Sequence, residues 1–287
     1  MKKLSIIIPH FNAELGLCNL LDSIPNHDWI EIIVVDDNSI KNIFILKSSY
    51  ENVSFYKLDK TRKGAGAARN VGIKHSKGDL LLFADSDDFF LDDAFCIIHK
   101  YLNTKNDMIY FNPTSLKLSS NTEGTRHVKY SDLINMYLDT DNKELLYNFY
   151  VPWSKLISSK FIKEKNIKFD EVIASNDVIF SLKSAFYASK ILCTLDKIYC
   201  VTESSNSLTK ILTEEVLDSR FDAISRYNDF LQKEGYTKLQ LAMSGHLWST
   251  RYFGFYKFLY RLFFCKYKKY PIFYDFNHII KALRHLK

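Results

Sequence analysis

The chain has 287 residues, of which 47% are hydrophobic and 25% charged, values typical of a globular protein that exclude intrinsic disorder and collagen-like structure. Glycine and proline number only 9 and 5, and no fixed-period repeat is present, which argues against a linker-rich array or a solenoid. The five cysteines are scattered without a CxxC pair, so reduced thiols in the cytoplasm are favoured over a zinc knuckle or a disulfide framework.

The net charge of +6 is unevenly distributed along the chain. From His246 onward there are nine Lys and Arg against one acid, whereas residues 1–245 carry a net charge of −2. The same C-terminal region holds 14 of the 43 aromatic residues. A basic and aromatic region is typical of contact with nucleic acid or with a membrane surface.

Continuous apolar runs alternate with helical patterns through residues 4–111. Pro9 ends the first apolar run too early for a signal peptide, and no uncharged apolar stretch is long enough to span a bilayer. Alternation of this kind predicts a mostly parallel sheet covered by helices on both faces. The predicted strands are 4–8, 30–35, 53–58, 80–84 and 108–111, and the predicted helices are 13–24, 65–76 and about 92–102.

The pattern weakens after Asn112. We predict a polar loop over 112–130, helices over 133–150, 159–165 and 176–189, a strand over 191–201, and helix from Thr213 onward. The chain therefore divides into a nucleotide-binding half (1–111), a second half on the same sheet (112–209), and a helical, basic and aromatic C-terminal region (210–287).

Polar clusters follow three predicted strands, at residues 9–12, 36–39 and 85–88. Open α/β sheets bind ligands at the carboxyl ends of their strands, so these clusters should converge at one edge. Asp85 and Asp87 are separated by one residue, so in an extended segment their side chains share a side. Such a pair suits Mg²⁺ or Mn²⁺ with substrate phosphates as the other ligands. The alternative is an acidic cap on the next helix.

Residues 64–70 form a fourth cluster around Gly64 and Gly66. It fails as a dinucleotide fingerprint, because Arg69 stands at the third glycine position and the segment follows the third strand. The turn can still offer backbone N–H groups to a phosphate, and Arg69 adds a guanidinium suited to phosphate. The alternative is a surface arginine on an Ala-rich helix.

The order and spacing of these motifs over residues 4–88 resemble those of the family 2 glycosyltransferases, nucleotide-sugar enzymes with the GT-A fold. The matching segments are LSIIIPHFN at 4–12, IVVDDNS at 33–39, GAGAARNVG at 64–72, GD at 78–79 and FADSDD at 83–88, with weaker matches at 153–156, 167–171, 176–177 and 207–209. The resemblance implies an α/β fold with a Rossmann-like, mostly parallel sheet flanked by helices and a helical C-terminal extension.

The resemblance also implies roles for individual residues. Asp177 would be the catalytic base and Asp87 the metal ligand, for Mn²⁺ or Mg²⁺. Asp177 could instead cap a helix, with Asp170 or Glu171 as the base. The residues implied in nucleotide-sugar binding are Pro9, Phe11, Asn12, Asp37, Gly66, Arg69, Asp85 and Ser86, with the Phe11 ring against uracil and Asp37 accepting a hydrogen bond from the base.

Four positions are weaker or depart from the family. Asn176 stands where the family usually has Glu, and Lys41 where it often has Asp. Trp153 could stack on an acceptor sugar and Lys155 could meet an acceptor phosphate. A buried Trp153 that packs on the sheet is the alternative.

The function implied by the family is inverting, metal-dependent transfer of a hexosyl or N-acetylhexosaminyl group from a UDP-sugar to a saccharide or lipid-linked saccharide. Bacterial capsule, O-antigen or lipooligosaccharide would be the product. One alternative is a non-catalytic, membrane-bound partner with the GT-A fold. Another is a sugar nucleotidyltransferase, which would need a basic Gly-rich loop directly after the first strand.

The C-terminal region has the residue pattern of an amphipathic helix. At 100° per residue its aromatic residues gather on one side and Lys257, Arg261 and Lys268 on another. This division predicts a helix on an anionic membrane surface, at the cytoplasmic face, and not a nucleic-acid site. The alternative is packing on the catalytic domain or on a second subunit in a homodimer. The aromatic side comprises Tyr252, Tyr256, Leu259, Tyr260, Phe263 and Tyr267.

Overall fold

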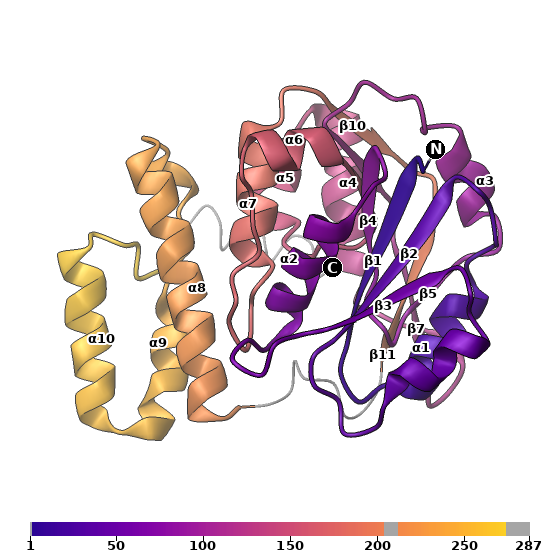
Figure 1. The fold of residues 1–287 in the computed structure, drawn as a ribbon. Helices are drawn as coiled ribbons and strands as arrows, with labels where there is room; N and C mark the ends of the chain where they lie inside the picture. The colour runs from indigo at the N-terminus through magenta and orange to yellow at the C-terminus, as the bar shows by residue number, and fades with distance from the viewer. Residues whose placement is uncertain (1, 204–211, 274–287) are drawn as a thin grey trace.

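The computed structural model describes residues 2–203 and 212–273 (Figure 1). The weak family match at 207–209 and the last part of the predicted C-terminal region, 274–287, lie outside the described residues.

A seven-stranded sheet forms the centre of the molecule, in the order β10-β6-β9-β4-β1-β2-β3. All neighbouring pairs are parallel except those made by β9, which runs antiparallel between β4 and β6. Its strands are β1 (Leu4–His10), β2 (Ile30–Asp36), β3 (Val53–Lys57), β4 (Leu80–Phe83), β6 (Met108–Phe111), β9 (Lys155–Ser158) and β10 (Ile191–Thr194).

Helices cover both faces of this sheet. Successive residues of its strands point to opposite sides, and because these residues are apolar, both sides must be buried. In β2, Ile32 and Val34 join the core that contains α1, whereas Ile33 and Val35 pack with α2. The predicted α/β class, with a mostly parallel sheet, is confirmed. The helices of this part are α1 (Glu14–Asp22), α2 (Ala65–His75), α3 (Ala94–His99), α4 (Val128–Thr140), α5 (Glu144–Asn148), α6 (Ser159–Glu164) and α7 (Val178–Tyr187), with a 3₁₀ helix at Ile43–Ser48.

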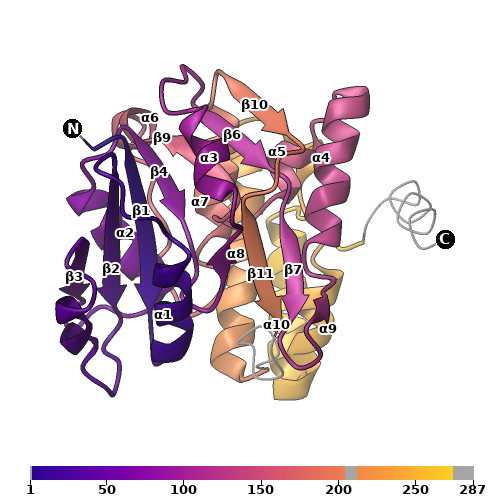
Figure 2. The ribbon, with the colours of Figure 1, turned by 90° about the vertical axis from the view of Figure 1, so that its right-hand side faces the viewer.

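A second sheet, absent from the sequence prediction, has the order β5-β11-β7-β8. Figure 2 shows its two longest strands, β7 and β11, side by side. Its strands are β5 (Phe89–Phe90), β7 (Thr114–Lys117), β8 (Thr122–Glu123) and β11 (Tyr199–Glu203). The predicted loop over 112–130 is therefore wrong, because β7 and β8 are short and polar and carry no apolar alternation. The predicted single strand over 191–201 is also wrong, since β10 and β11 belong to different sheets.

Residues 112–209, the predicted second half, thus contribute to both sheets. They add β10 and the unpredicted strand β9 to the large sheet, but β7, β8 and β11 to the small one. The predicted helix over 133–150 is two helices, which separate at Asp141 in the left-handed conformation, with φ of 53°.

The C-terminal region is helical, as predicted, and α8 lies between α7 and α10 (Figure 1). Its elements are α8 (Glu214–Lys233), α9 (Ser244–Thr250) and α10 (Phe255–Tyr267), with 3₁₀ helices at Thr237–Leu239 and Arg251–Phe253. Tyr227 and Leu231 of α8 pack on Val178, Ile179 and Leu182 of α7. Within the described ranges, no helix is both long and apolar enough to cross a membrane.

The two sides of α10 are divided as predicted, but the charged side faces protein. Lys257 Nζ lies 2.7 Å from a carboxylate oxygen of Asp218, and Lys268 Nζ lies 3.0 Å from Asp229 Oδ1. The aromatic side is left open to solvent. We call this surface the α10 aromatic face; it comprises Tyr252, Tyr256, Tyr260, Phe263 and Tyr267, which are 65–88% exposed.

Candidate active site

The polar clusters after β1 and β2 are joined by hydrogen bonds at the carboxyl edge of the sheet. The Asp37 backbone N–H donates to the His10 carbonyl at 2.8 Å. The Asn12 N–H donates to Ser39 Oγ at 2.9 Å, and Asn12 Oδ1 accepts from the Ile40 N–H at 2.8 Å. Asn12 adopts a left-handed conformation, with φ of 49°, which asparagine tolerates better than most residues. The predicted convergence of these two clusters is present.

Asp37 offers an unpaired oxygen at this edge. Its Oδ2 accepts a hydrogen bond from the Gly64 N–H at 2.6 Å, which ties in the loop before α2. Its Oδ1 is buried and has no partner in the described part of the chain. Burial raises the pKa of Asp37, and the bond from Gly64 partly offsets the rise. A buried acceptor without a partner is costly, so this oxygen suits a hydrogen bond from a ligand.

Phe11 and Pro9 differ in their exposure to solvent. The Phe11 side chain is 56% exposed beside this edge, so its ring is available for stacking. Pro9 is buried within β1, so it shapes the end of the strand and offers no exposed face.

Residues 85–88, which follow β4 and which we call the acidic turn, are held by two residues of β11 that the sequence analysis did not identify. The Asp85 N–H donates to the Tyr199 hydroxyl, which in turn donates to Asp88 Oδ2, both at 2.8 Å. The Thr202 N–H donates to Asp88 Oδ1 at 2.8 Å, and Thr202 Oγ1 donates to the Asp87 carbonyl at 2.7 Å. Burial and the charges of Asp85 and Asp87 raise the pKa of Asp88 well above its usual range.

Arg69 connects the acidic turn to the segment before α7. It is only 4% exposed, so the surface-arginine alternative is wrong. One amino group of its guanidinium forms an ion pair with Asp85, and the other donates to Asn176 Oδ1 at 2.7 Å. Its Nε is buried without a partner among the residues described. Asn176, which stands where the resemblance leads one to expect Glu, thus bonds the arginine without adding a charge.

Asp177 occupies the position before α7, where the side chain could have capped the helix. It makes no capping hydrogen bond, so the alternative of a mere cap is not supported. The preceding Ser175 is in a left-handed conformation, with φ of 56°. Burial raises the pKa of Asp177; nearby Arg69 lowers it and Asp85 raises it. A partly buried carboxylate with a raised pKa is a typical general base.

The two alternative bases are engaged elsewhere. Asp170 Oδ2 lies 3.0 Å from Nε of Arg226, on α8. Glu171 accepts two hydrogen bonds from Arg62, one of them from Nε at 2.9 Å. The bond from Arg62 lowers the pKa of Glu171, which makes this carboxylate a weaker base.

Gly66 and Ser86 are packed against neighbouring segments. A Cβ at Gly66 would lie 2.0 Å from the Asp170 carbonyl oxygen, so glycine permits α2 to approach the 170–176 segment. Ser86 is 8% exposed, and a Cβ at Gly16 of α1 would lie 2.7 Å from its carbonyl oxygen. Nucleotide binding by Gly66 and Ser86 therefore stays a prediction for their backbone groups.

The predicted acceptor contacts of Trp153 and Lys155 are contradicted by burial. Both side chains are 1% exposed. Trp153 stacks on the Tyr199 ring with centroids 6.0 Å apart, and Lys155 Nζ donates to the Phe149 carbonyl at 2.7 Å. Neither can meet an acceptor directly, because both belong to the core beneath the site.

Among the described residues, the acidic turn offers one or two carboxylates to a divalent cation, so further ligands would have to complete its shell. Partial desolvation and the charge of Asp85 raise the pKa of Asp87, which indicates uncompensated negative charge there. No group of three or more metal-binding side chains occurs within the described residues. Hard cations such as Mg²⁺ bind through one or two carboxylates when substrate phosphates and water complete the shell, and Asp87 with Asp85 fits this pattern.

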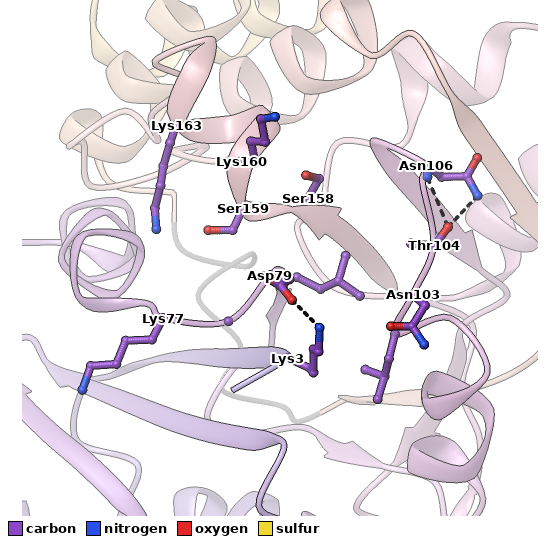
Figure 3. A pocket seen from close by; sticks show the side chains of 13 residues that line it. Lys3, Lys77, Asp79, Asn103, Thr104, Asn106, Ser158, Ser159, Lys160 and Lys163 are labelled. Atoms are coloured by element: carbon purple, nitrogen blue, oxygen red, sulfur yellow. Dashed lines mark hydrogen bonds and ion pairs between the residues drawn. The ribbon is translucent and has the colours of Figure 1, made fainter. Parts of the chain in front are cut away.

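A cavity lies away from this edge, at the opposite end of the sheet's strands. Its volume is about 520 Å³, and Figure 3 shows Lys3, Lys77 and Lys163 among the side chains around it. Lys3 precedes β1 and forms an ion pair with Asp79, just before β4, at 3.0 Å. The cavity is therefore at the amino-terminal ends of β1 and β4, opposite the polar clusters.

Comparison with known proteins gives one family match. The model for glycosyl transferase family 2 matches residues 5–164. The poly(ribitol-phosphate) β-glucosyltransferase of Bacillus spizizenii is 32% identical over 207 residues, covering 69% of this chain and 32% of that protein. The poly(ribitol-phosphate) β-N-acetylglucosaminyltransferase TarS of Staphylococcus aureus is 27% identical over 215 residues, covering 69% and 35%. The chain thus spans about a third of the length of these relatives.

Solved structures share the fold. Residues 1–349 of S. aureus TarS in complex with UDP-GlcNAc superpose with a TM-score of 0.68 at 20% identity, covering 88% of this chain and 73% of that chain. The mannosyltransferase PcManGT of Pyrobaculum calidifontis, in complex with GDP-Man and Mn²⁺, gives a TM-score of 0.54 at 14% identity, covering 92% and 75%. These similarities confirm the predicted GT-A type of fold.

Proposed function

Since the chain belongs to glycosyl transferase family 2, we propose that it transfers a sugar from a UDP-sugar to a hydroxyl group of a saccharide or lipid-linked saccharide, with inversion at the anomeric carbon. The observation that carries this proposal is that the start of α2 meets three polar segments. The Gly64 N–H bonds Asp37, and Arg69 bonds both Asp85 in the acidic turn and Asn176, which precedes Asp177.

Asp177 would act as the general base. An acceptor hydroxyl is a poor nucleophile at neutral pH, and a carboxylate within hydrogen-bond reach can take its proton as the new bond to the sugar forms. Attack from the side opposite the leaving group inverts the anomeric centre. Asp170 and Glu171 are less suited, because Arg226 and Arg62 already neutralise them.

The departing UDP would be held at Asp37 and the acidic turn. The unpaired Oδ1 of Asp37 can accept a hydrogen bond from the base, and the exposed Phe11 ring can stack on it. Mn²⁺ or Mg²⁺ bound at Asp87 would supply positive charge for the diphosphate. Arg69 lies deeper, so it would fix Asp85 and add a fixed positive charge close to the leaving group.

The acceptor is proposed from chemistry and from relatives. Two relatives are named as glycosyltransferases acting on poly(ribitol-phosphate), which supports a bacterial cell-surface polymer as the product class. The test is UDP release with UDP-GlcNAc, UDP-glucose and UDP-galactose and with Mn²⁺, in the presence of saccharide, lipid-linked saccharide or poly(ribitol-phosphate). We expect release to depend on one donor and one acceptor and to be lost in Asp177→Asn. Release from no donor would favour a non-catalytic partner.

The proposal includes contact with the anionic, cytoplasmic surface of a membrane through the α10 aromatic face. Trp and Tyr rings favour the membrane–water interface, and this face is open. Lys257, Arg261 and Lys268, the cations predicted to meet lipid, form ion pairs with carboxylates of α8. Membrane binding would therefore rest mainly on the aromatic rings. Lys266 and Lys269 are exposed beside them and would add attraction to anionic lipid.

Co-sedimentation with phosphatidylglycerol vesicles tests this contact. We expect the wild-type chain to sediment and the triple variant Tyr256→Ser, Tyr260→Ser, Phe263→Ser to stay in solution. The control is Leu118→Ser with Leu195→Ser, two residues that are also exposed but lie elsewhere. A wild-type chain that does not sediment would contradict the membrane contact. So would a dimer in solution that the triple variant abolishes, because a second copy would then cover the face.

A further inference from the structure

Lys155 is a buried lysine without a role in the proposed mechanism. It begins β9, between β4 and β6 in the large sheet, and is 1% exposed. Removing an ammonium group from water costs several kcal/mol unless other groups compensate for it. A lysine in this position therefore requires a reason that packing alone does not give.

Neutral groups hold the Lys155 ammonium in place. Its Nζ donates to the Phe149 carbonyl oxygen at 2.7 Å and lies 3.4 Å from Ser181 Oγ. The rings of Phe149 and Tyr110 lie around it, with centroids 4.7 Å and 5.2 Å from Nζ. Ring faces attract a cation, and the carbonyl oxygen accepts a hydrogen bond from it, so the charged form is partly stabilised.

These contacts place Lys155 under the first turn of α7, the helix that follows Asp177. Ser181 belongs to that turn, and its N–H donates to the Asp177 carbonyl oxygen at 2.9 Å. Burial lowers the pKa of Lys155 to about 7, while the charge of Asp177 raises it. In return, Lys155 lowers the pKa of Asp177.

Three further groups face Asp177 from other elements. Arg69 of α2 lowers the pKa of Asp177, and Asp85, after β4, raises it. Tyr130 of α4 is also near, and burial together with the charge of Asp177 raises the pKa of Tyr130 to about 12, so its phenol stays neutral. Arg69 is shared with Asp85 through an ion pair. Lys155 is thus a second positive charge acting on Asp177, and among the described residues Asp177 is the carboxylate that acts on Lys155.

We propose that Lys155 is a positioning residue for Asp177: from beneath the first turn of α7, its ammonium keeps the carboxylate ionised and in place without touching substrate. This inference rests on the proposed role of Asp177 as the general base. A positioning role also explains why Lys155 lies in the core below the site and not at the surface, where it could meet an acceptor.

Reciprocal titration tests the coupling. In protein labelled with ¹³C-lysine, the Lys155 signal is assigned by its absence from Lys155→Arg, and its titration midpoint is compared between the wild-type chain and Asp177→Asn. We expect the midpoint to fall by roughly one pH unit when the Asp177 charge is removed, the size of effect that one nearby charge produces. A midpoint that does not move would overturn the proposal.

Kinetics provide the second measurement. In Lys155→Met, the low-pH limb of kcat should move to higher pH by roughly one unit while the Kd for UDP stays unchanged, and Lys155→Arg should restore the limb. The matched control is Lys160→Met, at an exposed lysine of α6. A loss of equal size at every pH would indicate a merely structural lysine and overturn the proposal. If Lys155→Met does not fold, the titration in Asp177→Asn decides.

The two proposals fail in different ways. Full turnover in Asp177→Asn would remove the base from the proposed function and this inference with it. An inactive Asp177→Asn in which the Lys155 midpoint is unchanged would leave the base in place and refute only the role of Lys155.

Discussion

Tyr199→Phe removes a buried hydroxyl that joins Asp85 to Asp88. In the wild-type chain this hydroxyl accepts from the Asp85 N–H and donates to Asp88 Oδ2, both at 2.8 Å, and the Tyr199 side chain is fully buried. The substitution leaves the ring and its packing on Trp153 unchanged. It therefore tests the hydrogen bonds alone.

The expected cost follows from the two groups left unpaired. Each buried group that loses its partner costs about 1–3 kcal/mol, so the free energy of unfolding should fall by about 3 kcal/mol. Asp88 keeps its bond from the Thr202 N–H, which limits the loss. Because the Asp85 N–H is released, the acidic turn becomes looser, and the affinity for UDP in Mn²⁺ should fall roughly tenfold, equivalent to about 1.4 kcal/mol.

Urea unfolding and calorimetric titration with UDP measure these two effects. The matched control is Tyr110→Phe, because Tyr110 is equally buried but its hydroxyl has no partner among the described residues. Loss of that hydroxyl should leave stability unchanged or raise it slightly. If both variants lose the same free energy of unfolding, or if UDP affinity is unchanged in Tyr199→Phe, the reasoning is refuted.

Two further predictions concern Asp87 and His10. Asp87→Ala should abolish transfer and the metal dependence of UDP binding, and near-wild-type turnover with Mn²⁺ would show that the metal ligand is wrongly assigned. His10 is 1% exposed with both ring nitrogens unpaired in the described structure, and burial lowers its pKa below 6.5. As pH falls below about 6.5 the unfolded chain binds a proton that the fold excludes, so the free energy of unfolding drops by up to about 1.4 kcal/mol per pH unit. His10→Val should flatten this decline in urea titrations at pH 5–7, and an unchanged slope would contradict the prediction.

Local signals explain which strands the sequence predicts. β1, β2 and β4 are continuous apolar runs, because they are buried on both faces. β9 lies in the middle of the same sheet but begins with a lysine, and β7 and β8 are short and polar. None of these three strands carries a long apolar run. β7 and β9 pair with strands far along the chain, whereas β8 forms a short hairpin with β7.

The candidate site also contains residues that the sequence predicts and residues that it does not. The clusters that contain Asp37 and Asp85 follow predicted strands, and parallel strands bring their carboxyl ends together, so convergence can be predicted. Tyr199 reaches the Asp85 N–H from 114 residues away, and no local motif marks it. The sequence also predicts the two sides of α10, but the side that faces protein is decided by Asp218 and Asp229 of α8.

The most direct test of the proposed mechanism is the turnover of Asp177→Asn with the donor and acceptor identified by UDP release. Asparagine has nearly the same shape and the wild-type side chain does not cap α7, so the fold should be unchanged. We predict that kcat falls roughly 10²-fold or more while the Kd for UDP stays near the wild-type value. Asp170→Asn, the matched control, should retain most of its turnover. A fall of less than about tenfold in Asp177→Asn, or a larger fall in Asp170→Asn, would contradict the assignment of Asp177 as the base.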